Sequence, residues 1–125
     1  MPDAVVNKHI VYNPVDYIMQ LIGGIWKTPV LWRLKNKDYR YTELEKNIPH
    51  ISQKMLTKAL KELEADGIIS KTVYPEVPPK VIYSLTAKGK KLIPLIETIR
   101  NAGIVLMKED GIDYEKMIKE EKRKA

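Results

Sequence analysis

The chain of 125 residues contains no cysteine. Without a thiol it can form no disulfide, no thiolate metal site and no cysteine nucleophile, and this composition is compatible with a reducing cytoplasm. The sequence also lacks an apolar run as long as a membrane span, and residues 1–14 lack the basic start and long apolar centre of a signal peptide. We therefore expect a cytoplasmic protein that is not inserted in a membrane.

No enzyme signature is present either. The two histidines, His9 and His50, are far apart in the sequence and have no metal-ligand spacing, and the pair Gly23 and Gly24 is not a phosphate-binding loop. We predict no catalytic residues, no metal site and no cofactor. With 44% hydrophobic residues, the chain is long enough to form one domain around its own core.

The positive charge is concentrated in one part of the chain, whose overall net charge is +6. Residues 27–91 contain fourteen basic and seven acidic side chains, a surplus of +7. Residues 1–26 contain one basic and two acidic side chains, and residues 92–125 contain seven of each. A localised basic surplus is typical of a surface that binds a polyphosphate, and a generally basic protein would not show it.

The stretch from Ser52 to Gly67 predicts an amphipathic helix with a basic outer face. At about 100° per residue, the inner face consists of Leu56, Ala59, Leu60 and Leu63. The outer face carries a stripe of Lys54, Lys58 and Lys61. Ser52 is suited to cap the first turn and Gly67 to end the last one. Alone, such a helix could simply be solvated, but the neighbouring segments favour a binding role.

A shorter helix is predicted just before this one. Thr42 and Glu45 have the spacing of a capping box at its start. Pro49 disfavours helical geometry at the residue before it, so a tight connection is expected before Ser52. Together these segments predict a helix-turn-helix, a motif whose second helix enters the major groove of DNA by its N-terminal residues.

Between residues 68 and 85 the side-chain pattern no longer repeats with the helical period but alternates every two residues, as in a β-strand. Two β-rich runs, 68–74 and 81–85, flank the sequence PEVPPK, which is unsuited to a strand. The predicted hairpin follows the recognition helix directly, and its loop is stiffened by prolines and carries a lysine. This is the position of the wing in a winged helix-turn-helix. A hairpin without a contact role is the alternative.

Helices are also predicted on both sides of this motif. Residues 14–22 and 26–35 have helical apolar spacing, and Thr86 is suited to start a long last helix that Pro94 is expected to kink. The apolar stripe of the last helix is broader than one small motif can cover, which favours a two-fold dimer interface over an extended monomer core. We divide the chain into a domain over residues 1–107 and a charged C-terminal tail over 108–125, and we assign the tail no function.

The chain resembles the HxlR-type winged helix-turn-helix transcription regulators over about residues 13–107. The resemblance is carried by LIGGIW (21–26), RYTELEKNIPHIS (40–52), LTKALKELEADGII (56–69) and YPEVPPKVIYSLTAKG (74–89). It implies a mostly α fold with a small β-hairpin and a dimer formed by the first and last helices. On that basis we expect interface residues at Ile18, Leu21, Leu95, Ile99 and Leu106. Asn13 stands where these proteins usually have a cysteine, and Ile25 where they usually have a lysine.

We predict a sequence-specific DNA-binding transcriptional regulator that binds an inverted-repeat operator as a homodimer. A winged-helix protein-interaction module without specific DNA binding is the alternative. Base contacts are expected from Gln53 and Lys54, with Ser52, Thr57 and Lys58 beside them. Phosphate contacts are expected from Arg40, Lys61, Lys71 and Lys80. A small-molecule effector, if the protein has one, is expected in an apolar pocket between the first and last helices.

DNA binding is predicted to be insensitive to thiol oxidants, although thiol-based sensing is described for some proteins of this type. A cysteine switch needs a thiolate that can be oxidised, and Asn13 has no such chemistry. A DNA-binding titration before and after diamide treatment should give the same affinity, with methionine oxidation monitored by mass spectrometry. Loss of binding while the five methionines remain intact would contradict the prediction.

Overall fold

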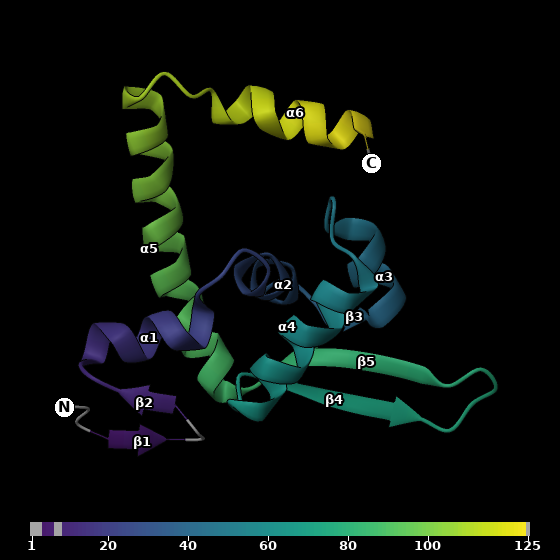
Figure 1. Cartoon of the computed structure of the whole chain (residues 1–125). Helices are drawn as coiled ribbons and strands as arrows, with labels where there is room; N and C mark the ends of the chain where they lie inside the picture. Colours follow the sequence, from purple (N-terminus) through teal and green to yellow (C-terminus); the bar gives the residue numbers. More distant parts are fainter. Residues whose placement is uncertain (1–3, 7–8, 125) are drawn as a thin grey trace.

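The computed structural model describes residues 4–6 and 9–124, and shows a mainly helical protein with one extended β-hairpin (Figure 1). Within the described residues no helix is both long enough and apolar enough to cross a bilayer. The elements follow in the order β1 (Ala4–Val6), β2 (His9–Val11), α1 (Pro14–Ile22), α2 (Lys27–Leu34), β3 (Tyr39–Arg40), α3 (Tyr41–Asn47), α4 (Gln53–Ala65), β4 (Ile69–Tyr74), β5 (Lys80–Leu85), α5 (Ala87–Glu109) and α6 (Tyr114–Lys124).

The hydrophobic core is centred on α2 and α4, and the neighbouring helices and strands cover it. Side chains with no exposed surface include Val30 and Leu31 of α2, Leu44 of α3, and Leu56 and Leu63 of α4. The four apolar residues predicted to form the inner face of α4 are all buried. The helical periodicity of residues 52–67 therefore located the buried face of this helix correctly.

The start of α3 differs from the prediction. The helix begins at Tyr41, and the carboxylate of Glu43 accepts a hydrogen bond of 3.0 Å from the backbone N–H of Arg40. The capping box predicted at Thr42 and Glu45 is therefore wrong by two residues. The cause is tertiary, because β3 pairs with β5 through residue Arg40 and the chain enters the helix directly after this pairing.

Two sheets are present among the described residues. The predicted wing is the antiparallel hairpin β4–β5, which extends away from the helices in Figure 1. The two-residue strand β3 adds to β5 to give the order β3-β5-β4. The second sheet is the hairpin β1–β2 beside α1, which the sequence analysis did not predict. The mostly α fold with a small antiparallel sheet, in winged helix-turn-helix order, is confirmed.

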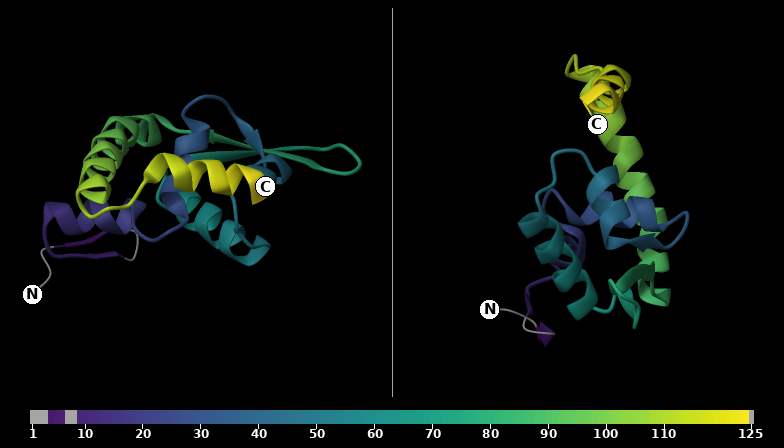
Figure 2. Two further views of the ribbon diagram at one scale, coloured as in Figure 1. Left: turned by 90° about the horizontal axis from the view of Figure 1, so that it is seen from above. Right: turned by 90° about the vertical axis from the view of Figure 1, so that its right-hand side faces the viewer.

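The two C-terminal helices extend from one side of the core. The hydroxyl oxygen of Thr86 accepts a hydrogen bond of 3.1 Å from the N–H of Gly89 and so caps α5, as predicted. Helix α5 continues through Pro94 to Glu109, past the proposed domain boundary at residue 107. Helix α6 follows after a short turn, and the right-hand view of Figure 2 shows α6 at the top and the N-terminal hairpin at the bottom.

Gly89 is predicted to be irreplaceable by alanine, in contrast to Gly103 of the same helix. A Cβ at position 89 would overlap the backbone carbonyl of Ile68, whereas a Cβ at position 103 would meet no atom within 4 Å. Overpacking of this kind costs about 1–3 kcal/mol. Replacement of a glycine inside a helix by alanine, where there is room for the Cβ, stabilises the protein by about 0.5–1 kcal/mol. Urea unfolding should show Gly89→Ala destabilised and Gly103→Ala unchanged or stabilised; equal effects would contradict this close packing.

Candidate nucleic-acid interface

The N-terminal half of α4 presents polar side chains to solvent. Its first turn contains no acidic residue. Because the opposite face is buried in the core, the outer face is fixed in orientation. The predicted contact residues that are exposed here are Ser52, at the N-cap, and Gln53, Lys54, Lys58 and Lys61 of the helix. The structure therefore places five of the nine predicted DNA-binding residues on α4 or at its cap, all of them exposed.

The turn before α4 is held at both ends. His50 has a φ of 64°, in the left-handed region, and reverses the chain between the two helices. The hydroxyl oxygen of Ser52 accepts a hydrogen bond of 3.1 Å from the N–H of Met55, which confirms its predicted role as N-cap. On the other side, the guanidinium of Arg33 donates a hydrogen bond of 2.8 Å to the carbonyl of Asn47, the last residue of α3.

Thr57 is partly covered by Tyr41, a residue that the sequence analysis did not select. The hydroxyl groups of these two residues lie 3.1 Å apart, and the Tyr41 hydroxyl also donates to the carbonyl of Gln53 at 3.4 Å. Tyr41 thereby joins α3 to α4 and lines a shallow groove along α4 with Gln53, Lys54 and Lys58. No local pattern reveals a contact between residues sixteen positions apart, so this role could be found only from the structure.

The remaining three predicted contact residues do not share a face of the wing. Lys71 lies opposite Tyr83 in the register, and Tyr83 is buried against the core. Lys80 lies opposite Tyr74, with its ammonium 5.4 Å from the centre of the tyrosine ring. Arg40 lies opposite Ile82, two residues from Lys80 along β5. Because side chains alternate along a strand, Arg40 and Lys80 lie on one face and Lys71 on the other.

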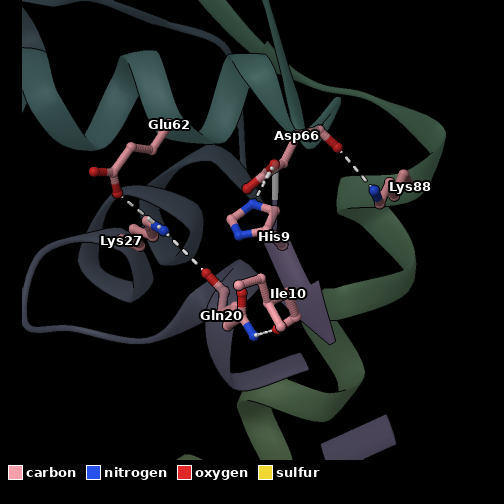
Figure 3. Close-up of polar contacts among 7 residues, drawn as sticks. All are labelled: His9, Ile10, Gln20, Lys27, Glu62, Asp66 and Lys88. Atoms are coloured by element: carbon pink, nitrogen blue, oxygen red, sulfur yellow. Dashed lines mark hydrogen bonds and ion pairs between the residues drawn. The ribbon is translucent and has the colours of Figure 1, made fainter. Parts of the chain in front are cut away.

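The C-terminal end of α4 makes polar contacts with three other elements of the protein (Figure 3). The ammonium of Lys27 in α2 lies 3.1 Å from the carboxylate of Glu62. The imidazole of His9 in β2 lies 2.8 Å from the carboxylate of Asp66, which is 5% exposed. The ammonium of Lys88 in α5 donates to the backbone carbonyl of Asp66 at 2.8 Å. The helix is thus anchored at its C-terminal end and open at its N-terminal end.

A model of the family described as "HxlR-like helix-turn-helix" matches residues 21–110, which include α2, the helix-turn-helix, the wing and α5. The chain belongs to this family. The resemblance noted from the sequence motifs is thereby confirmed.

Two similar proteins are named as HTH-type transcriptional regulators. An uncharacterised HTH-type transcriptional regulator of Methanothermobacter thermautotrophicus is 48% identical over 85 residues, which are 68% of this chain and 65% of that protein, just under two thirds of its length. The uncharacterised HTH-type transcriptional regulator YdeP of Bacillus subtilis is 46% identical over 90 residues, 72% of this chain and 70% of YdeP. These relatives are transcriptional regulators and not enzymes, as was predicted for this chain.

A solved structure supports the same assignment. The redox regulator HypR in its oxidised form has a TM-score of 0.69 and 42% sequence identity, over 73% of this chain and 94% of that one. HypR is named for redox regulation, whereas this HxlR-like chain has no cysteine.

The outer helices of this family member expose an apolar surface. Among the described residues, the exposed hydrophobic side chains include Val15 and Met19 on α1 and Leu95, Ile99, Val105 and Leu106 on α5. Ile18 is half-buried and packs against the core. Leu21 is only 2% exposed and belongs to the core of its own chain. Leu21 therefore has no free surface to offer a partner, and we leave it out of the candidate interface.

Proposed function

We propose that this HxlR-like protein is a sequence-specific DNA-binding transcriptional regulator that inserts α4 into the major groove. The observation that supports the proposal most is the asymmetry of α4. Its C-terminal end is fixed by contacts with Lys27, His9 and Lys88. Its N-terminal end presents an amide side chain and lysines without an acid in the first turn. This is the end by which recognition helices contact bases.

Gln53 and Lys54 are the proposed base-reading residues. Glutamine can pair with the edge of adenine and lysine with that of guanine in the major groove. Thr57 is the weaker candidate of this group, because its hydroxyl already lies against that of Tyr41. Ser52 and Lys58 lie beside Gln53 and Lys54 at the end proposed to enter the groove. Phosphate contacts are proposed for Lys61 of α4, for Lys71 on the core-facing side of the wing, and for Arg40 and Lys80 on its other side.

A homodimer is the proposed DNA-binding form. One short helix makes too few base contacts to select a unique site in a genome, so a second copy reading an inverted repeat would supply the missing specificity. The exposed apolar residues of α1 and α5 provide a surface that a two-fold partner can cover. The proposed interface consists of Ile18, Leu95, Ile99 and Leu106.

The alternative is a winged-helix module that binds another protein. Such a module would not need its positive charge concentrated on α4 and the wing. The groove along α4 is shallow, and its lining includes three lysines and one acid, Glu62. A gel-shift assay with mixed duplex DNA at low salt separates the two functions, since only the DNA-binding protein retards the duplex.

Binding to duplex DNA is predicted to weaken steeply with salt. Each neutralised phosphate should contribute a slope of about −0.9 in log affinity against log salt concentration. The Lys71→Ala variant should reduce the slope by about one phosphate. Lys116→Ala, an exposed lysine on α6, is the control and should leave it unchanged. Fluorescence anisotropy with a selected duplex measures the slopes, and a flat response of the wild type would refute the function.

Removal of a base-reading side chain is predicted to relax sequence preference. Gln53→Ala or Lys54→Ala should cost about 1–3 kcal/mol on the preferred duplex and little on other sequences. Lys61→Ala is the comparison variant, because loss of a phosphate contact should weaken binding to all sequences alike. Competition titrations with preferred and scrambled duplexes measure both effects. An equal loss on all DNA for Gln53→Ala would remove Gln53 from the base-reading set.

A charge in the proposed interface is predicted to produce folded monomers. Ile99→Glu or Leu106→Glu would bury a carboxylate between two copies of α5, and both variants should bind the operator poorly. Asn101→Glu places the same charge about 200° around the helix from Ile99 and should leave the dimer intact. Sedimentation velocity measures the oligomeric state. A monomeric wild type that binds a single half-site with full affinity would contradict the dimer.

A further inference from the structure

A hollow of ≈ 270 Å³ lies between α2, α5 and the start of α6. Its wall combines two arginines with aromatic and aliphatic side chains, namely Trp32, Arg33, Ile96, Ile99, Arg100 and Tyr114. It shares Arg100 and Tyr114 with an adjoining open hollow of ≈ 560 Å³ between α5 and α6. Known ligand pockets measure about 300–1,000 Å³, so the two together have the size of a small-molecule site.

Arg100 lies close to two aromatic rings in this wall. Its guanidinium carbon lies 5.2 Å from the centre of the Trp32 ring and 5.4 Å from that of Tyr114. One of its nitrogens donates to the Tyr114 hydroxyl at 3.4 Å. Stacking against rings orients the planar fork of an arginine, and leaves its remaining N–H groups available for an anion.

Two more cations lie in this region, one on the Trp32 ring and one in the wall of the hollow. The ammonium of Lys35 lies 4.3 Å from the centre of the Trp32 ring. Arg33 lines the hollow and donates to the backbone carbonyls of Pro29 and Asn47. Burial lowers the pKa of Arg33, because its charge is partly removed from water. A positive charge that has lost hydration gains most from an anionic partner.

No carboxylate of the described residues neutralises this cluster. The ion pairs formed among them involve His9, Lys27 and Lys37, and none involves Arg33, Lys35 or Arg100. Helix α2 contains no acidic residue. The nearest acids that line the adjoining hollow are Asp113 and Glu115, and Asp113 accepts a hydrogen bond from the backbone N–H of Lys116.

We propose that this hollow binds a small organic anion with a flat apolar body, such as an aromatic carboxylate. The carboxylate pairs with Arg100 and Arg33, and the ring packs on Trp32, Ile96 and Ile99. The site is not between α1 and α5, where an effector was expected from the sequence, but between α2, α5 and the start of α6. The role of this hollow as an effector site rests on the proposed DNA-binding function.

A bound anion would act on the helix-turn-helix through Arg33. The same guanidinium that lines the hollow holds the carbonyl of Asn47, where α3 ends and the turn to α4 begins. A carboxylate that draws Arg33 towards the hollow competes with this hydrogen bond. Ile99, at the rim of the hollow, also belongs to the proposed dimer surface. A bound anion would therefore affect both the position of the helix-turn-helix and the dimer contact, and operator binding depends on both.

The first experiment compares 2-naphthoate with its neutral amide, 2-naphthamide, on the full-length wild-type protein. The chain has two tryptophans, so ¹⁵N-labelled protein gives two indole N–H resonances, which Trp26→Phe assigns. Trp26 lines a different hollow, beside α4. Saturable binding of 2-naphthoate should shift the Trp32 resonance and leave that of Trp26 in place, and the amide should bind at least about tenfold more weakly. Absence of saturable binding, equal binding of the amide, or a shift at Trp26 alone would overturn the proposal.

The second experiment locates the anion. Arg100→Gln should weaken 2-naphthoate binding by about tenfold or more in isothermal titration calorimetry, which corresponds to about 1.4 kcal/mol. Lys91→Gln removes an exposed charge from the same helix outside the hollow and should bind as the wild type does. Should Arg100→Gln fail to fold, Arg100→Lys keeps the charge without the planar fork and should also lose affinity. Unchanged affinity in a folded Arg100 variant would overturn the assignment.

DNA titrations with and without saturating 2-naphthoate separate this inference from the proposed function. A protein that binds the anion but no DNA would refute the function and leave the site standing. A protein that binds DNA but not the anion would refute the site alone. A change in operator affinity supports the effector role, and an unchanged affinity with the site filled would remove it.

Discussion

The packing of α4 against α2 determines what the protein can present to DNA. Leu56 and Leu63 of α4 and Leu31 of α2 have no exposed surface. Truncation of such a leucine to alanine costs about 2–5 kcal/mol, so a rotation of α4 by one residue, which would expose these side chains, is excluded. The lysines on the opposite face owe their orientation to this constraint. The hydrophobic core and the basic surface are therefore two sides of one packing arrangement.

The polar contacts around α4 complement that packing by fixing its position along the axis. Asp66 is held through its carboxylate by His9 and through its backbone by Lys88, so β2 and α5 meet at the end of the helix. At the N-terminal end, the hydroxyl oxygen of Ser52 caps the first turn and the Tyr41 hydroxyl contacts Gln53 and Thr57. A helix fixed at one end and accessible at the other can enter a groove without changing its contacts with the core.

Sequence patterns predicted those features that depend on local periodicity. The buried face of α4, the caps at Ser52 and Thr86 and the wing hairpin all follow from neighbouring residues. The start of α3 at Tyr41 does not, because the pairing of the preceding residue, Arg40, with Ile82 of β5 decides it. Leu21 shows a second limit: helical spacing identifies it as apolar, but not whether its own core or a partner covers it. The contact of Tyr41 with Thr57 and the hollow around Arg100 join separate helices, and no local spacing encodes them.

The hydroxyl of Thr86 links the start of α5 to the end of α4. It donates to the carbonyls of Gly67 and Ile68, just beyond the end of α4, while it caps α5. The base of α5 and the end of α4 therefore move together. With 23 residues, α5 is a lever about 34 Å long. In the proposed dimer, a tilt of about 6° between two such levers displaces their ends by about 3.5 Å, close to the rise of about 3.4 Å between successive base pairs. If α5 forms the proposed dimer, a small change of angle between its two copies is enough to change the distance between the two recognition helices by about one base-pair step.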